Sequence, residues 1–278
     1  MARRVSSSAA FETITRAANH APWITLVHGL SQDHRLFDRQ VEVFQDSYHL
    51  LLIDLPGHGR SSDVPGPYGL QDYARSIEGV LGDVGALACH FWGTHIGAGA
   101  GLLLASRRPG LFRSLVLEAP VFPGRPLPAV NDLLPRISAI AKEQGMDAAR
   151  EAWWQEGAWF DVMRRHPKSC RAAEQRRIID GFQGQPWLDA GFVSQRPKAI
   201  DASLTGLKAP TMIINGEHDL PDFVAIAGQL ETLMPYAERS VVKGAGGFPL
   251  WEFPDETNQI VMDFLSRHQR PRDTSSHR

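Results

Sequence analysis

The chain has 278 residues and a net charge of −2, because 29 Lys and Arg residues are balanced by 31 Asp and Glu residues. This balance argues against nucleic acid or an anionic membrane surface as the main partner. Hydrophobic residues make up 43% and charged residues 22%, a composition that excludes a disordered chain. Two cysteines, Cys89 and Cys170, are too few and too far apart for a disulfide framework or a CxxC site.

The N-terminal segment 1–8 carries two arginines, but no apolar run of signal-peptide length follows it. No run approaches the roughly 18 apolar residues of a membrane-spanning helix either. We therefore expect a cytoplasmic protein with no membrane segment, whose partner is a small molecule. The oligomeric state does not follow from the sequence.

Strands and helices alternate over residues 1–120. Short apolar, β-branched runs predict strands at 23–27 and 49–53, and apolar residues at helical spacing between them predict a connecting helix. The alternation continues with a helix over 70–81, a strand over 86–91, a helix over 96–106 and a strand over 114–117. This order predicts an α/β fold with a parallel sheet covered by helices on both faces.

The alternation stops over residues 121–204. This segment is first proline-rich and then helical, with an unusual number of large aromatic side chains: Trp153, Trp154, Trp159, Phe160 and Trp187. We interpret it as a helical lid inserted into the core.

The core resumes over residues 205–268. Strands are expected at 210–214 and 240–242, followed by a helix over 254–265. The polar tail 269–278 is expected to be flexible.

Ligands of open parallel sheets bind beyond the carboxyl ends of the strands. The segments that follow the predicted strands are therefore the candidates for the functional site. These segments are His28-Gly29, the Asp54–Ser61 loop, Gly93–Gly97, Gly216–Asp219 and Gly244–Pro249. In this order they resemble the α/β-hydrolase superfamily, and the resemblance covers nearly the whole chain. It implies the α/β-hydrolase fold and an enzyme of that superfamily.

Two positions depart from the pattern of that superfamily. The nucleophile elbow, Gly-x-Ser-x-Gly in the family, here has His95 in place of the serine. Gly247 stands where the family has its catalytic histidine, and only the carboxylate, Asp219, is in its expected place. A Ser-His-Asp mechanism is therefore not predicted. Thr94, the neighbouring hydroxyl, is a poor substitute because the residue before the elbow apex faces away from the nucleophile position.

Other parts of the machinery match the family. The resemblance implies two backbone N–H donors of an oxyanion hole, which correspond to Leu30 and Ile96. We hypothesise that His95 leans into the volume left empty at Gly247 and is oriented by Asp219, which would raise its pKa and make it a general base. Glu118, after the strand that ends at Leu117, is the second candidate for the orienting carboxylate.

A carboxylate-oriented imidazole opposite an oxyanion hole suits proton abstraction beside a carbonyl group. Lyase, isomerase, cyclase and water-activated hydrolase reactions are all compatible with it. The scheme needs no cofactor, and the histidines lack metal-ligand spacing. The alternative is a catalytically silent relative that binds a ligand or partner in the retained pocket.

Several further side chains are candidates for the pocket. Trp153 and Trp154 are expected either to pack in the core of the lid or to line the pocket, the latter favouring an apolar or aromatic carbonyl compound. His28 is interpreted as a structural residue of the oxyanion loop. His34 either reaches the mouth of the pocket or caps the next helix.

Overall fold

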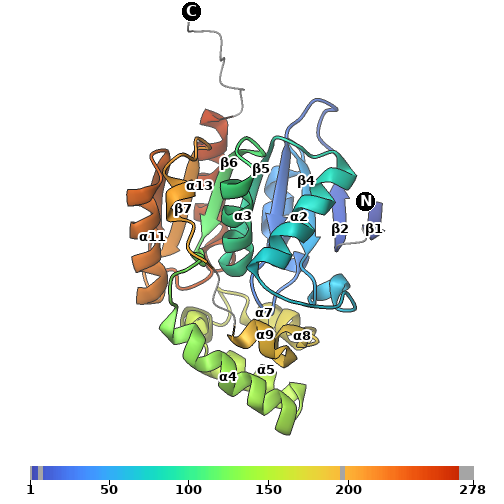
Figure 1. Cartoon of the computed structure of the whole chain (residues 1–278), viewed down its shortest axis with the longest axis vertical. Coiled ribbons are helices and arrows are strands. Elements are labelled where there is room, and N and C mark those ends of the chain that lie inside the picture. The colour runs from blue at the N-terminus through green and yellow to red at the C-terminus, as the bar shows by residue number, and fades with distance from the viewer. Residues whose placement is uncertain (1, 6–8, 195–197, 269–278) are drawn as a thin grey trace, which may run out of the picture.

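A computed structural model describes residues 2–5, 9–194 and 198–268 (Figure 1). Their central feature is one eight-stranded sheet in the order β1-β2-β4-β3-β5-β6-β7-β8. The strands are β1 (Ala2–Val5), β2 (Ala10–Ile14), β3 (Trp23–Val27), β4 (His49–Asp54), β5 (Cys89–Thr94), β6 (Phe112–Glu118), β7 (Thr211–Gly216) and β8 (Ala237–Val242). Pairing is parallel from β4 across to β8 and antiparallel at the β1–β2 edge. The predicted fold class is confirmed.

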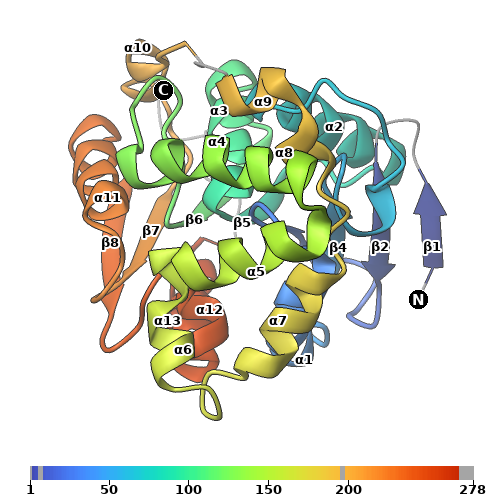
Figure 2. The ribbon, with the colours of Figure 1, turned by 90° about the horizontal axis from the view of Figure 1, so that it is seen from below.

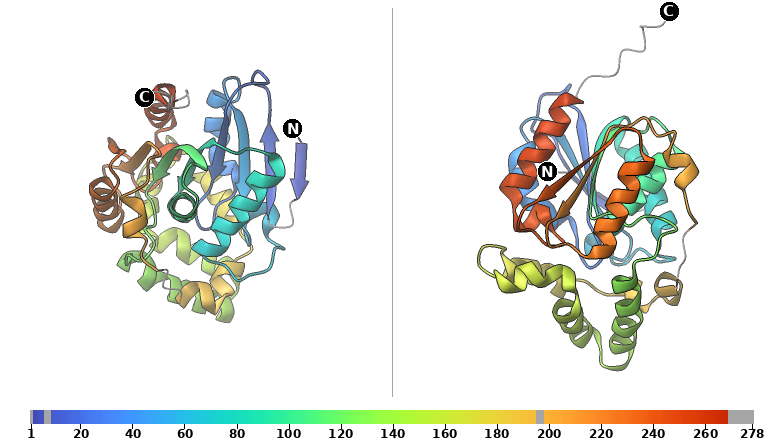
Figure 3. Two further views of the ribbon diagram at one scale, coloured as in Figure 1. Left: turned by 45° about the horizontal axis from the view of Figure 1, so that its top comes forward. Right: turned by 90° about the vertical axis from the view of Figure 1, so that its left-hand side faces the viewer.

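Helices cover both faces of the sheet. They are α1 (Asp38–Phe44), α2 (Leu70–Val84), α3 (His95–Arg107), α11 (Pro221–Leu233), α12 (Pro249–Glu252) and α13 (Pro254–Arg267), with 3₁₀ turns η1 (His34–Phe37) and η2 (Gly59–Ser61). Figure 3 shows α13 on one face and α3 and α11 on the other. Because both faces are covered, all six residues of β4 and all six of β5 are buried.

Every helix between β6 and β7 lies in the segment 121–204, which we call the helical insertion. Its described elements are α4 (Pro128–Glu143), α5 (Met146–Glu156), η3 (Ala158–Phe160), α6 (Asp161–Arg165), α7 (Ala172–Asp180), α8 (Gln185–Leu188), α9 (Ala190–Ser194) and α10 (Asp201–Leu204). Seen from below, α4 and α5 lie across the end of the sheet (Figure 2).

Buried hydrogen bonds join the helical insertion to the core. The Trp153 indole N–H donates to Ser31 Oγ over 2.8 Å, and the Gln175 side-chain amide donates to Gln32 Oε1 over 2.6 Å. From the core, the Trp251 indole donates to the Cys170 carbonyl over 2.9 Å. The helical insertion is therefore held against the carboxyl ends of the strands.

Four core elements were not anticipated: strands β1 and β2, and helices α11 and α12. Strand β5 also begins at Cys89, three residues later than predicted, because Ala88 has a φ of +54° and interrupts the extended backbone. The polar tail 269–278 lies outside the described residues. Among those that are described, no helix combines the length and apolar character needed to cross a bilayer.

Candidate active site

The site is built around a sharp turn between β5 and α3. Strand β5 ends at Thr94, and α3 begins at His95, whose φ is +47°. A left-handed backbone at a residue with a side chain costs about 1–2 kcal/mol. The turn is tight because a Cβ at Gly97 would lie only 2.5 Å from the Val27 carbonyl oxygen. The elbow is thus formed with an imidazole at its apex.

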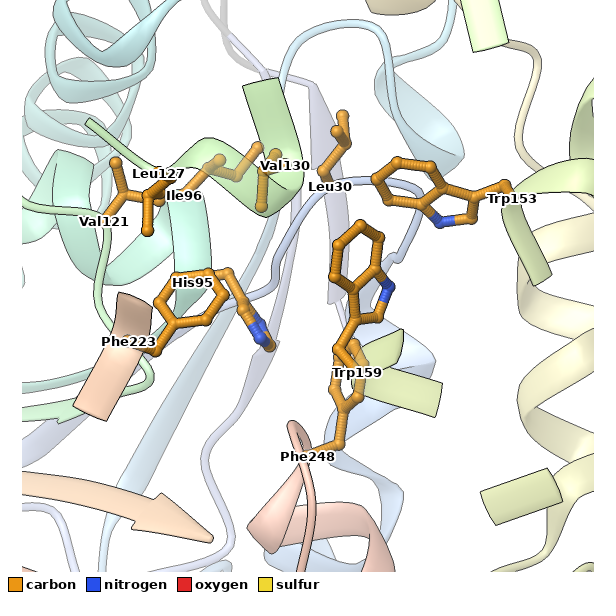
Figure 4. A pocket seen from close by; sticks show the side chains of 10 residues that line it. All are labelled: Leu30, His95, Ile96, Val121, Leu127, Val130, Trp153, Trp159, Phe223 and Phe248. Atoms are coloured by element: carbon orange, nitrogen blue, oxygen red, sulfur yellow. The ribbon is translucent and has the colours of Figure 1, made fainter. Parts of the chain in front are cut away.

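The His95 ring lies between two aromatic rings. Its centroid is 4.7 Å from that of Phe248 and 5.3 Å from that of Phe223, and the residue is 8% exposed (Figure 4). Neither ring nitrogen makes a hydrogen bond of normal geometry within the described structure. Burial lowers the pKa of His95 to about 4, and the nearby Gly247 backbone opposes this only partly. The imidazole is therefore neutral at pH 7.

Asp219 does not orient this imidazole. Its Oδ2 accepts a 2.8 Å hydrogen bond from the Asn215 side-chain amide, and its Oδ1 accepts one of 2.8 Å from the Leu220 backbone. Among the described residues neither His95 nitrogen has a hydrogen-bond partner of normal geometry, so the hydrogen bond expected between Asp219 and His95 is not formed. The expected rise in the pKa of His95 was consequently wrong in direction, because burial acts without an opposing charge.

Glu118, the second candidate for this role, is fully buried and accepts a 3.4 Å hydrogen bond from the Leu250 backbone. Glu252, which the sequence did not single out, accepts from the Gly246 backbone. Burial raises the pKa of Asp219 to about 7 and that of Glu252 to about 8, and it raises the pKa of Glu118 strongly. No Lys, Arg or His of the described chain forms an ion pair with any of these three carboxyl groups.

The space beside Gly247 is occupied by the helical insertion. A Cβ at Gly247 would lie 2.6 Å from the Trp159 Cβ and 3.0 Å from the Trp159 carbonyl oxygen. Next to this contact, the rings of Phe160 and Phe248 stack at 5.3 Å and an angle of 7°. The expectation that Gly247 leaves a volume for His95 was therefore wrong, because Trp159 fills it.

A partly open cavity lies beside the elbow, between the core and the helical insertion (Figure 4). Its lining consists of Leu30, His95, Ile96, Val121, Leu127, Val130, Trp153, Trp159, Phe223 and Phe248. His95 is the only titratable side chain among them. The cavity therefore offers an apolar, aromatic environment with a single imidazole.

The two expected oxyanion donors border this cavity. Ile96 is the second residue of α3, so its backbone N–H has no acceptor within the helix. The Leu30 N–H forms no backbone or side-chain hydrogen bond in the part of the chain described. His95 Nδ1 adjoins the same loop, since a Cβ at Gly29 would lie 3.2 Å from it.

Comparison with known proteins agrees with this architecture. Residues 26–260 match the model of the alpha/beta hydrolase family. The chain belongs to that family. The prediction of an α/β-hydrolase-family enzyme is thereby confirmed.

The relatives of this alpha/beta hydrolase include proteins named as hydrolases. It is 26% identical to a protein of Pantoea ananatis named as a carbamate hydrolase, RutD, over 89% of both chains. It is also 26% identical to a 2-hydroxy-6-oxononadienedioate/2-hydroxy-6-oxononatrienedioate hydrolase of a Pseudomonas species, over 83% of this chain and 82% of the other. The enol-lactonase of Burkholderia xenovorans has the same fold, with a TM-score of 0.80 and 22% identity over 95% of this chain and 100% of that one.

Most of the other predicted pocket residues do not line the cavity of this alpha/beta hydrolase. Trp153 does, but the following do not: His28, His34, Thr94, Glu118, Trp154 and Gly247. Trp154 faces Phe160 within the helical insertion, with ring centroids 4.8 Å apart. Thr94 is fully buried, and its hydroxyl has no partner in the described structure.

The two histidines of the first loop have structural partners. Buried His28 accepts the Leu55 backbone N–H at Nε2 over 2.9 Å and donates from Nδ1 to the Gly29 carbonyl over 2.7 Å. This pairing supports the loop that carries Leu30, as interpreted from the sequence. His34 Nδ1 lies 3.0 Å from Asp54 Oδ1, away from the cavity. Across the described residues, no three His, Cys, Asp or Glu side chains gather as metal ligands.

Proposed function

We propose that this member of the alpha/beta hydrolase family is an enzyme acting on a small apolar or aromatic carbonyl compound, with His95 as the proton acceptor and no serine nucleophile. The observation that carries the proposal is that His95 supplies the only titratable side chain of an apolar cavity that Leu30 and Ile96 also border. A substrate carbonyl at the two backbone N–H groups would lie beside the imidazole. The relatives named for carbamate and for an oxo-dienedioate support a carbonyl substrate class.

The neutral imidazole determines what chemistry is available. Because burial lowers the pKa of His95 to about 4, the ring is in its proton-accepting form throughout the neutral range. An imidazole with so low a pKa is a weak base. Proton removal becomes easier when the negative charge left on the substrate moves to a carbonyl oxygen, because the oxyanion donors stabilise that oxygen. One such donor contributes about 3 kcal/mol to transition-state stabilisation. Removal of a proton beside a carbonyl group meets this condition, and so does activation of a water molecule.

A second candidate function rests on the contact between Gly247 and Trp159. Since Trp159 fills the space of the family histidine and Asp219 is bonded elsewhere, the cavity also suits a protein that binds an apolar ligand without converting it.

Exchange of carbon-bound hydrogen in D₂O tests the first proposal. Phenylacetone offers a methylene between a phenyl ring and a carbonyl group, and its loss of proton signal is followed by ¹H NMR. We expect the wild type to accelerate exchange and His95→Gln to lose about 100-fold of that rate, the typical contribution of one general base. The rate should be constant between pH 5 and pH 7, because the pKa of His95 lies below this range.

His166→Gln is the matched control, because it removes an exposed imidazole outside the cavity and should leave exchange unchanged. Hydrolysis of p-nitrophenyl butyrate, followed with the same variants, tests the water-activated reaction. Binding of phenylacetone with neither reaction would favour the ligand-binding candidate, and equal rates for wild type and His95→Gln would remove His95 from the mechanism.

A further inference from the structure

We propose that the cavity accepts neutral ligands and rejects carboxylates, with Trp159 as the residue that seals it from the polar groups behind the elbow. This inference rests on the proposed function, since it names the substrate class of the same site. The preference is for the charge of the ligand and is additional to any preference set by the shape of the cavity.

The lining contains no positive charge. Nine of its ten side chains are apolar or aromatic, and none is Arg or Lys. The tenth, His95, is neutral at pH 7 because burial lowers its pKa to about 4. A carboxylate entering this cavity would lose its hydration without gaining a charged partner, which is strongly unfavourable.

The segment that carries the lining residue Phe248 is bonded to acidic groups. Glu118, Asp219 and Glu252 are all more than 90% buried, and each is bonded only to neutral N–H donors within the described structure. Glu118 Oε2 and Glu252 Oε1 have no partner at all there. A second anion nearby would repel any ionised member of this group. The surroundings therefore add to the cost of a charged ligand.

Trp159 contacts both the cavity and the loop that bonds to these carboxyl groups. Its Cβ and carbonyl oxygen cover Gly247, and Gly246, the residue before, donates its N–H to Glu252. The Trp159 ring lies 4.6 Å from the Trp153 ring, and both line the cavity. In Figure 4, Trp159 and Phe248 form one wall and His95 faces them from the other side. Trp159 thus covers the loop at Gly247 with an aromatic residue that also lines the cavity.

This charge preference separates the chain from one of its relatives. The hydrolase named for 2-hydroxy-6-oxononadienedioate acts, by that name, on a substrate with two carboxylates. The cavity of this chain has no cation to receive either of them. We therefore expect the substrate to be a neutral compound rather than a dicarboxylate.

A pair of ligands with nearly the same shape tests the inference at pH 7. Acetophenone is neutral and benzoate is anionic, and titration calorimetry measures both dissociation constants on the intact protein without depending on turnover. We expect acetophenone to bind at least about 100-fold more tightly than benzoate. Benzoate binding as tightly as acetophenone would overturn the inference, and so would the absence of acetophenone binding.

Val130→Lys supplies the missing charge on the partly exposed face of α4. We expect this variant to reduce the ratio of the benzoate to the acetophenone dissociation constant by at least about tenfold, because the benzoate carboxylate gains a positively charged partner. Leu188→Lys is the matched control, since it adds the same charge at a residue that is 43% exposed and does not line the cavity, and it should leave the preference unchanged. If Val130→Lys does not fold, the ratio of the two dissociation constants of the wild type still tests the inference.

Binding and hydrogen exchange distinguish failure of the charge preference from failure of the proposed catalysis. Tight binding of acetophenone and weak binding of benzoate without any hydrogen exchange of phenylacetone would refute the proposed catalysis and leave the charge preference standing. Trp159→Leu tests the role assigned to the seal: we expect it to weaken acetophenone binding and to leave benzoate weak. If Trp159→Leu leaves acetophenone binding unchanged, Trp159 does not determine the specificity.

Discussion

At the scale of single residues, His95 illustrates how burial and charge compete. A carboxylate partner would raise the pKa of an imidazole, whereas removal from water lowers it. Asp219 does not act as this partner, because its two oxygens accept hydrogen bonds from the Asn215 side chain and the Leu220 backbone. Burial therefore prevails, and the elbow presents a neutral ring between Phe223 and Phe248.

Gly247 provides a residue-scale prediction about stability. Gly247→Ala should lower the free energy of unfolding by about 1–3 kcal/mol, because the added methyl would meet Trp159 at 2.6 Å and force the two segments apart. Urea unfolding measures the change.

Gly228→Ala is its control. A Cβ at Gly228, on α11, would meet nothing within 4 Å, so this change should be neutral or stabilise by about 0.5–1 kcal/mol. Equal effects of the two substitutions would show that the contact between Gly247 and Trp159 is not tight in solution.

At the scale of elements, the elbow depends on how closely α3 approaches β3. Helix α3 buries ten of its thirteen residues and has small residues, Gly97 to Gly101, where it meets its neighbours. The Cβ of a larger residue at Gly101 would collide with the Phe91 ring, and one at Gly97 would collide with the backbone that follows β3. The close packing supports the strained backbone of His95.

Gly97→Ala tests this packing. Because the neighbouring atoms belong to backbone and cannot rotate away, we expect a loss of 3 kcal/mol or more by overpacking, at the upper end of the roughly 1–3 kcal/mol usual for such changes. Thermal unfolding followed by circular dichroism measures it. Gly82→Ala, on α2 with open space around it, is the matched control and should not lower the melting temperature.

The sequence predicted elements best where their burial is uniform. Strands β3 and β4 are apolar runs buried on both faces, and their predicted ranges agree with the structure to within one residue. Strand β2 was missed because its burial is mixed and because its pairing with β4 joins residues about 40 positions apart. Long-range pairing of this kind is not encoded in local periodicity.

At the scale of the whole molecule, buried titratable groups make stability depend on pH in two directions. Burial lowers the pKa of His95 and His90 to about 4 and that of His58 to about 3. Their contribution to stability is present above the unfolded value of about 6.5 and is lost as pH falls toward the folded values. Asp219 and Glu252 behave oppositely, because their folded pKa values, about 7 and about 8, lie above the unfolded ones.

Between about pH 7.5 and pH 8.5, the histidines are already neutral in both the folded and the unfolded state, so the buried carboxyl groups dominate the change in stability. We expect the free energy of unfolding to decrease over this range, by up to about 1.4 kcal/mol per pH unit for each carboxyl that is still protonated in the fold. Urea unfolding at half-unit intervals measures the slope. Glu252→Gln should reduce the slope, whereas Glu231→Gln on α11, whose residue is exposed, should retain it. A slope that is the same in all three proteins would contradict the burial of an uncompensated Glu252.

The sequence by itself determined most of the alternation of strands and helices from β3 onward, the family, and the presence of His95 at the elbow and Gly247 in the late loop, because each of these depends on local pattern or on residue identity. Only the tertiary structure decided which groups meet. Trp159, 88 residues before Gly247, fills the space that the sequence left open, and Glu252 joins Asp219 and Glu118 in a buried group. The physical reason is that the position of the helical insertion follows from side-chain packing between distant segments. That packing also decides whether an imidazole at the elbow meets a carboxylate or two aromatic rings.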